Sequence, residues 1–242
     1  MVKVPSEKGE IQAFEAVPRG ECRGGIIVIH EVWGLADHIK DVAGRLANEG
    51  YLALAPELLA DTIDLPAVRP LQNDLFNPEK RHQTQPKLRA LMTPMQNPQF
   101  GRDTEARLAA CFDYLYNRPE TGRKVAVIGF CFGGTYSFSL AVRQPRLKLA
   151  LPFYGHSDHS VEELRRIKCP VRAFYGEKDE NLMNSLPELK DKMKQAGVDF
   201  EATVYPDCGH AFFNNTNPFA YNETAAKDAW QKVLSYLRKY IG

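Results

Sequence analysis

Short, uniformly apolar runs alternate along the chain with longer segments in which apolar residues recur every three to four positions. The short runs are rich in β-branched residues and end at glycine, proline or polar positions, which is the pattern of buried strands. We expect strands at 25–30, 51–55, 124–128, 147–154, 171–175 and 200–205. The longer segments predict helices at 37–49, 104–116, 135–143, 186–196 and 224–240.

Strands that alternate with helices predict an α/β fold with a mostly parallel central sheet and helices on both faces. Sheets of this kind bind ligands at the carboxyl ends of their strands, so functional side chains are expected just after the strands. A chain of 242 residues suits one such unit, and we expect residues 1–242 to form a single domain.

Residues 57–100 interrupt this alternation of strands and helices. The stretch has prolines at 66, 70, 78, 86, 94 and 98, and its hydrophobic periodicity is weak. A connection of this length inside a compact domain usually carries a function of its own. We therefore expect a Pro-rich, lid-like loop at about 57–100.

Composition and charge exclude several classes of function. The chain has 31 basic and 30 acidic residues, well mixed, so nothing favours a nucleic-acid or membrane-surface partner. No apolar run approaches the roughly 20 residues of a membrane span, and the first residues lack the apolar core of a signal peptide. The five cysteines form no CxxC pair, which favours free thiols and a cytoplasmic location.

The segment 129–134, Gly-Phe-Cys-Phe-Gly-Gly, directly follows an expected strand and precedes an expected helix. A strand, a tight turn with glycines on both sides of a reactive residue, and a helix form the context of a nucleophile elbow. Cys131 then lies near the positive end of the helix dipole, which favours the thiolate. A buried structural cysteine is the alternative, but the glycines favour a nucleophile.

A thiol nucleophile needs a base, and the base needs a carboxylate that fixes its orientation. Asp179 follows the expected strand at 171–175, and His210 follows the one at 200–205. The order Cys131, Asp179, His210 is the order found in α/β-hydrolases. Glu177 and Glu180 remain alternatives to Asp179.

Other candidate side chains have weaker support. His156 and His159, with Asp158 between them, could line the site or suggest a metal, but no third ligand completes a pattern. We interpret His30 as a core or loop-orienting histidine. Cys208 lacks the elbow context of Cys131. No metal site is predicted.

The segments at 129–134, 176–179 and 209–212 together resemble the G-x-C-x-G-G, G-x-x-D and G-H-x-F motifs of the dienelactone hydrolase family of α/β-hydrolases. The resemblance covers nearly the whole chain and implies the α/β-hydrolase fold. It also implies a cysteine-dependent, carboxymethylenebutenolidase-like hydrolase of a small ester or lactone. The Cys131 thiolate would form a thioester that water activated by His210 cleaves, with no metal or organic cofactor.

A further match lies at 30–35, His-Glu-Val-Trp-Gly-Leu. In the family this glutamate lies beside the cysteine and helps control its ionisation, so the resemblance implies that role for Glu31. The backbone N–H groups of Phe132 and Val32 are the expected oxyanion hole.

The family's type enzymes hold the substrate carboxylate with arginines. One of them lies four residues after the catalytic histidine, where this chain has Asn214, and a neutral amide cannot replace an arginine's charged, bidentate contact. Dienelactone itself is therefore not the expected substrate. Another arginine of the family comes from the long loop, and we expect Arg81 in that place. The other basic residues available in this stretch are Lys80, His82, Lys87 and Arg89. Trp33, Phe212 and Asn214 complete the expected substrate-binding set.

Two other functions stay open on the sequence. A thioesterase or a broad carboxylesterase would use the same residues on a different acyl group. A non-catalytic binding protein could keep the same fold. We expect a monomer or a small homo-oligomer.

Overall fold

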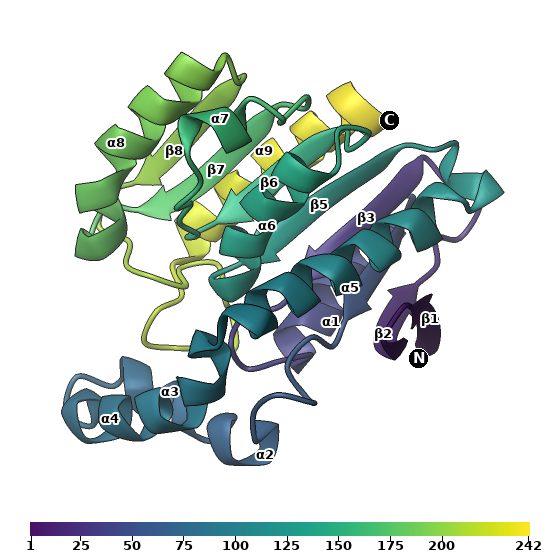
Figure 1. The fold of residues 1–242 in the computed structure, drawn as a ribbon. Helices are drawn as coiled ribbons and strands as arrows, with labels where there is room; N and C mark the ends of the chain where they lie inside the picture. The colour runs from purple at the N-terminus through teal and green to yellow at the C-terminus, as the bar shows by residue number, and fades with distance from the viewer.

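One eight-stranded sheet runs through the computed structural model, which describes residues 1–242 (Figure 1). The strand order is β1-β2-β4-β3-β5-β6-β7-β8. β2 pairs antiparallel with β1 and with β4, and all remaining pairs are parallel. The strands span Val2–Ser6, Gly9–Ala16, Gly24–Ile29, Tyr51–Pro56, Val125–Phe130, Leu149–Phe153, Val171–Gly176 and Phe200–Tyr205 in chain order.

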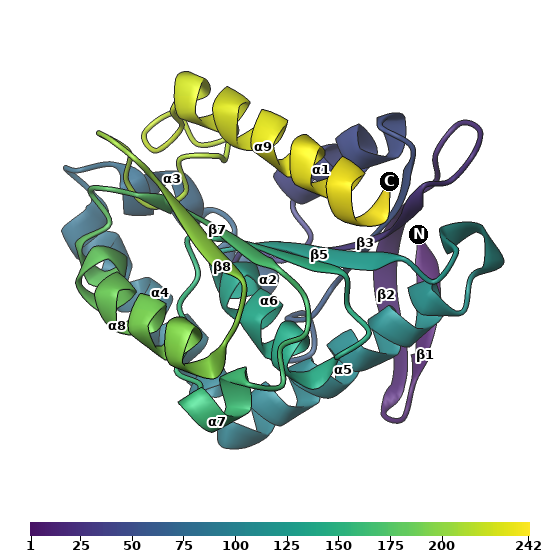
Figure 2. The same cartoon turned by 90° about the horizontal axis from the view of Figure 1, so that it is seen from above.

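Helices cover both faces of the sheet (Figure 2). α1 and α9 lie on one face, whereas α5, α6, α7 and α8 lie on the other. The α-helices α1 to α9 span Asp37–Asn48, Leu65–Val68, Leu71–Phe76, Arg81–Met92, Pro98–Tyr116, Phe132–Arg143, Val161–Leu164, Glu180–Ala196 and Glu223–Ile241. Two short 3₁₀ helices, η1 and η2, span Thr93–Gln96 and Pro119–Thr121. The expected mostly parallel α/β fold is confirmed.

The core lies in two layers, one on each face of the sheet. Successive side chains of a strand point to opposite faces, so a strand buried on both faces is apolar throughout. In β3, Ile27 and Ile29 belong to the layer under α5 and α6, whereas Ile26 and Val28 belong to the layer under α1 and α9. This burial explains the uniform apolar runs of the central strands.

The structure adds elements that the sequence patterns did not predict. The hairpin β1–β2 extends one edge of the sheet, and its polar side chains, such as those of the exposed pair Lys3–Glu10, mask its strand pattern. α5 begins at Pro98 and α8 at Glu180, each six residues before the predicted start. The first buried residues of these helices are Thr104 and Leu186, so periodicity did not mark the turns before them.

Residues 57–100 differ most from expectation, because the expected loop is largely helical. α2, α3, α4 and η1 fill this stretch and lie beside the carboxyl ends of the strands (Figure 1). Its prolines at 66, 70, 94 and 98 lie at or next to the first residue of a helix. A proline there loses no helical hydrogen bond, so these prolines start helices instead of preventing them.

None of the helices combines the length and the apolar character needed to cross a membrane.

Candidate active site

Cys131 occupies a strained turn between β5 and α6. Its φ of 55° and ψ of −109° lie in a region that non-glycine residues rarely adopt. The flanking glycines allow the close approach: a Cβ on Gly129 would lie 2.1 Å from the Gly133 carbonyl oxygen, and one on Gly133 would lie 2.2 Å from that of Ile29. The G-x-C-x-G-G pattern is therefore a packing requirement of this turn.

His210 and Asp179 form a hydrogen-bonded pair at the ends of β8 and β7. The His210 Nδ1 lies 2.5 Å from Asp179 Oδ2, and the histidine side chain is 34% exposed while the aspartate is 10% exposed. This geometry leaves the Nε2 side of the ring for another partner. Asp179 is thus the acid beside His210, and Glu177 instead accepts the backbone N–H of Asp207.

The loops that carry this pair are joined by backbone contacts. The N–H of Lys178 donates to the Cys208 carbonyl (2.8 Å), and that of Glu177 donates to the Tyr205 carbonyl (3.0 Å). A Cβ on Gly176 would lie 2.5 Å from the Cys208 carbonyl oxygen, so a side chain there would push the loops apart. The glycine in G-x-x-D thereby lets Asp179 reach His210.

Cys131 is the other partner of His210. Burial alone would lower the pKa of His210, but interaction with Cys131 and the hydrogen bond with Asp179 raise it to about 10. The imidazolium is therefore favoured between these two residues. The structure thus brings Cys131, Asp179 and His210 together.

Glu31 lies buried directly beneath this group, only 3% exposed. Its Oε2 accepts a hydrogen bond from Asn214 Nδ2 (2.7 Å), and its Oε1 lies 3.5 Å from the Tyr154 hydroxyl. Burial raises the pKa of Glu31 to about 7, and the charge of His210 and the bonds from Asn214 and Tyr154 offset only part of that rise. Glu31 can therefore hold or release a proton near neutral pH.

Tyr154 is a site residue that sequence reasoning missed. It follows β6, has a positive φ of 38°, and is 1% exposed. Its ring centroid lies 5.0 Å from that of His210, while its hydroxyl faces Glu31. Its position in the sequence could have identified Tyr154, because it lies between the end of a strand and Gly155, where ligand-facing residues collect.

Two backbone N–H groups near Cys131 have no acceptor within the protein. Neither Val32, in the loop after β3, nor Phe132, the first residue of α6, donates a backbone hydrogen bond. The next residue, Gly133, donates to the His30 carbonyl (3.1 Å) and so joins the two segments. Unpaired donors beside a nucleophile are the elements of an oxyanion hole.

A cleft of about 870 Å³ opens beside this group. Asp179 and His210 line one wall, and Arg81 and Arg89 of α4 line the facing wall, whereas Cys131 does not line the cleft. The wall formed by α3 and α4 consists of Leu75, Phe76, Arg81, Gln85, Leu88, Arg89 and Met92. Of the expected substrate-binding residues, Arg81 reaches this cleft.

Trp33, Phe212 and Asn214 lie elsewhere. Each is at most 3% exposed, and none of them lines the cleft. Asn214 turns inward, where it donates to Glu31 and accepts from the backbone and hydroxyl of Thr216. The structure therefore does not bring these side chains to the open cleft.

The remaining candidates, His156 and His159, contact hydroxyl groups away from Cys131, Asp179 and His210. His156 contacts the Thr135 hydroxyl at 3.1 Å, and His159 contacts that of Ser139 at 3.1 Å. No three His, Cys, Asp or Glu side chains are arranged to hold a metal ion.

Comparison with known proteins agrees with this architecture. The chain is 35% identical to a protein of Saccharolobus solfataricus named "Putative carboxymethylenebutenolidase", over 97% of this chain and 96% of the relative. A solved structure named "Putative Dienelactone Hydrolase" from Klebsiella pneumoniae superposes with a TM-score of 0.82 at 26% identity, covering 98% of this chain and 97% of that one. An esterase from Pyrococcus furiosus shares the fold, with a TM-score of 0.68 at 14% identity over 100% of this chain and 91% of its own.

The family pattern described as "Dienelactone hydrolase family" matches residues 11–241, which is nearly the whole chain. The fold, the extent of this match and the Saccharolobus relative agree with one another. The chain is a hydrolase that belongs to the dienelactone hydrolase family.

Proposed function

We propose that this protein hydrolyses a small carboxylic ester or lactone, with Cys131 as nucleophile, His210 as base and Asp179 as the acid that orients it. The observation that carries the proposal is a strained cysteine turn within electrostatic reach of a histidine that is itself hydrogen-bonded to Asp179. A strained, partly exposed nucleophile next to an oriented base is the arrangement of covalent acyl transfer.

In the first half of the reaction, the Cys131 thiolate attacks the carbonyl carbon of the substrate. The carbonyl oxygen becomes an oxyanion, which accepts hydrogen bonds from the N–H groups of Val32 and Phe132. The C–O bond to the leaving group then breaks, and the departing alkoxide takes the proton from His210. A thioester at Cys131 remains.

In the second half, His210 takes a proton from a water molecule, which attacks the thioester carbonyl. The C–S bond breaks, the acid leaves, and the thiolate and the imidazolium are restored. Asp179 stays ionised and holds His210 Nδ1 throughout (2.5 Å).

Glu31 has a separate role beside the triad of Cys131, Asp179 and His210. It is a buried acid with a raised pKa that lies within electrostatic reach of His210. Asn214 and Tyr154 hold its two oxygens. We assign it to control of the charge at Cys131 and His210, because its own ionisation adds or removes one buried negative charge.

The cleft wall formed by α3 and α4 favours a substrate with an acidic group. Arg81 and Arg89 lie two helical turns apart on α4, both line the cleft, and neither forms a salt bridge within the protein. Free guanidinium groups favour a carboxylate or a phosphate as partner. The proposed substrate is therefore a small ester or lactone that carries an anionic group.

The direct test replaces Cys131 by alanine and measures hydrolysis of p-nitrophenyl acetate. We expect kcat to fall by at least about 10³-fold, because the acyl-enzyme can no longer form. Cys22→Ala is the matched control, since Cys22 is the other partly exposed cysteine and precedes β3, at the end of the strand away from the site, and it should retain most activity.

Alkylation provides an independent readout of the same assignment. Iodoacetamide should modify Cys131 before the other four cysteines, three of which are buried. Turnover that survives in Cys131→Ala, or equal modification of all five cysteines in the folded protein, would contradict the assignment.

A further inference from the structure

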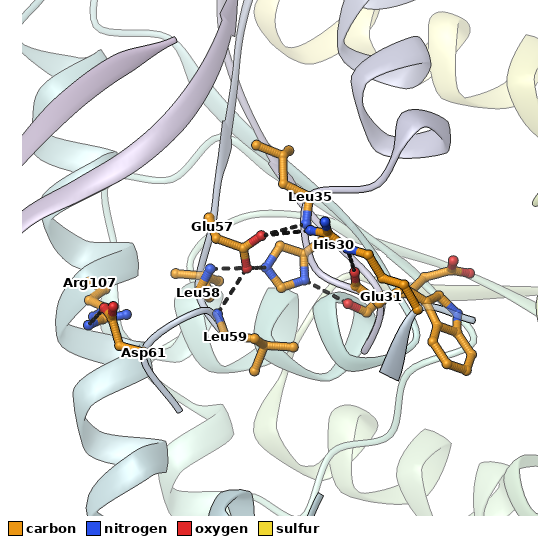
Figure 3. A network of polar contacts seen from close by, with 10 residues as sticks. His30, Glu31, Leu35, Glu57, Leu58, Leu59, Asp61 and Arg107 are labelled. Atoms are coloured by element: carbon orange, nitrogen blue, oxygen red, sulfur yellow. Dashed lines mark hydrogen bonds and ion pairs between the residues drawn. The ribbon is translucent and has the colours of Figure 1, made fainter. Parts of the chain in front are cut away.

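A buried polar network lies behind the loop that carries Glu31 and Val32 (Figure 3). Its centre is Glu57, the first residue after β4, whose side chain is 12% exposed. Glu57 is absent from the residues that line the cleft. The reaction described above uses none of its atoms.

Both oxygens of Glu57 are occupied by backbone donors. Oε2 accepts the N–H of Leu35 (2.8 Å), and Oε1 accepts the N–H of Leu59 (3.1 Å). Oε1 also lies 3.4 Å from His30 Nε2, and Oε2 lies 3.6 Å from the Arg69 guanidinium. One carboxylate thus joins the loop after β3 to the loop after β4.

Arg69, at the end of α2, makes a second contact with the same loop. Its Nε donates to the Trp33 carbonyl (3.0 Å), so Glu57 and Arg69 together hold two of the residues that follow Val32. We call Glu57 and Arg69 together the clamp. Gly34 packs directly on it: the φ of Gly34 is +71°, and a Cβ there would lie 2.8 Å from Glu57 Oε2. The loop therefore follows the position of the carboxylate closely.

His30 extends the network to the other N–H of the oxyanion hole. Its Nδ1 lies 2.7 Å from the Glu31 carbonyl, and its Nε2 accepts the N–H of Leu58 (3.0 Å). The tautomer protonated at Nδ1 satisfies both contacts, and we assign it on that basis. The ring also stacks on Phe132, with centroids 5.6 Å apart and planes 12° apart.

The charge of Glu57 is well supported in this position. Burial alone would raise the pKa of Glu57, whereas the N–H groups of Leu35 and Leu59 lower it. The two backbone donors and the Arg69 guanidinium therefore favour the ionised carboxylate. A permanently charged acceptor holds backbone donors more strongly than a neutral one does.

We propose that Glu57, with Arg69, is a positioning residue that fixes the loop 31–35 so that the Val32 N–H faces the oxyanion formed at Cys131. This inference rests on the proposed function, because it needs an oxyanion to stabilise. The clamp acts through the loop backbone and touches no substrate. Its loss misplaces one oxyanion donor, while the thiol, the imidazole and the cleft stay in place.

The test compares Glu57→Gln with the wild-type enzyme in three assays. For p-nitrophenyl acetate we expect kcat to fall about 10–100-fold with little change in KM, because a donor misplaced by about 1 Å costs this much. A trifluoromethyl ketone, which forms an oxyanion adduct with a thiol, should bind more weakly by a similar factor. Alkylation of Cys131 by iodoacetamide forms no oxyanion, so its rate should stay unchanged.

Asp61→Asn is the matched control. Asp61 lies in the same β4–α2 connection and pairs with Arg107 on the surface at 2.7 Å, apart from the clamp (Figure 3). It should leave all three assays unchanged. Arg69→Met is the second variant, since its half-exposed side chain tolerates replacement even if Glu57→Gln unfolds, and it should show the same pattern with a smaller loss.

Several results would overturn the inference. One is unchanged hydrolysis in both Glu57→Gln and Arg69→Met. Another is an equal loss in all three assays, which would indicate general disruption of the site. A third is a loss of kcat with unchanged affinity for the ketone. Failure of the wild-type enzyme to hydrolyse esters or to react at Cys131 would instead overturn the proposed function, and this inference with it.

Discussion

Two regions face each other across the cleft, and they differ in burial. The site floor, formed by residues 30–35, 129–134, 154, 179 and 208–214, includes His30, Glu31 and Asn214, which are 0–3% exposed. The lid comprises residues 71–96, and in it α3 buries no residue while α4 buries only Thr84. The floor joins segments from across the chain, whereas the lid is one continuous stretch.

This difference separates the two tasks of the enzyme. Groups that must be placed within a fraction of an ångström lie on buried, mutually bonded loops that cannot move independently. We propose that the groups that choose the substrate lie on the exposed lid helices, which tolerate change more readily. Changes on the floor should therefore lower turnover of every substrate, and changes on the lid should affect some substrates only.

The largest effect is expected from Asp179→Asn on the floor. The amide removes the charge that supports the imidazolium and can favour the wrong tautomer of His210, so kcat should fall on the order of 10³–10⁴-fold for all esters. Steady-state hydrolysis of p-nitrophenyl acetate measures this directly.

Glu177→Gln is the control for Asp179, because it lies two residues away and contacts the backbone of Asp207. It should keep nearly full activity. A loss in Glu177→Gln equal to that in Asp179→Asn would show that the loop as a whole, and not the carboxylate beside His210, is what matters.

The sequence predicted the floor better than the lid, for a physical reason. Cys131 and Asp179 each follow an apolar strand and have nearby glycines that tight backbone contacts require, so local patterns reveal them. His210 follows the alternating strand β8, and its position after that strand was the signal. The lid helices have little buried surface, and without a buried stripe there is no periodicity to detect.

Contacts between distant loops were beyond sequence reasoning even on the floor. Asn214 and Glu31 are 183 residues apart, and only the folded chain shows that the amide points to the carboxylate and not to the cleft. Glu57 was missed similarly, because an acid after a strand is ordinary until its two backbone partners are known.

A second prediction concerns the buried acid of the floor and the pH dependence of stability. The folded state raises the pKa of Glu31 from its ordinary value of 4.5 to about 7. Between these values the folded state keeps a proton that the unfolded state has released. The stability from this group is therefore full below about pH 4.5 and is lost as the pH rises through about 7.

Glu31→Gln removes this dependence while keeping the shape of the side chain. Relative to wild type, the variant should gain about 2–3 kcal/mol of unfolding free energy between about pH 5 and about pH 7.5, as measured by urea denaturation. Glu57→Gln is the control, because the pKa of Glu57 is lowered and its contribution is lost only as the pH falls below the ordinary value of 4.5. A constant difference between Glu31→Gln and wild type over this range would mean that Glu31 is already ionised at pH 5.

The smallest effect is expected on the lid, where it should depend on the substrate. Arg81 and Arg89 line the cleft opposite His210, so replacing both with methionine removes two positive charges but keeps much of the apolar stem. We expect kcat/KM for mono-p-nitrophenyl succinate, an anionic ester, to fall about tenfold, mostly through KM, with a smaller loss at high salt. Hydrolysis of neutral p-nitrophenyl acetate should change by less than about twofold, because its transition state does not contact the lid.

Lys87→Met is the control, because Lys87 lies on the same helix but outside the cleft lining, and it should change the hydrolysis of neither substrate. If both substrates lose activity together, the lid supports the geometry of the floor, and the division of tasks between the two regions fails.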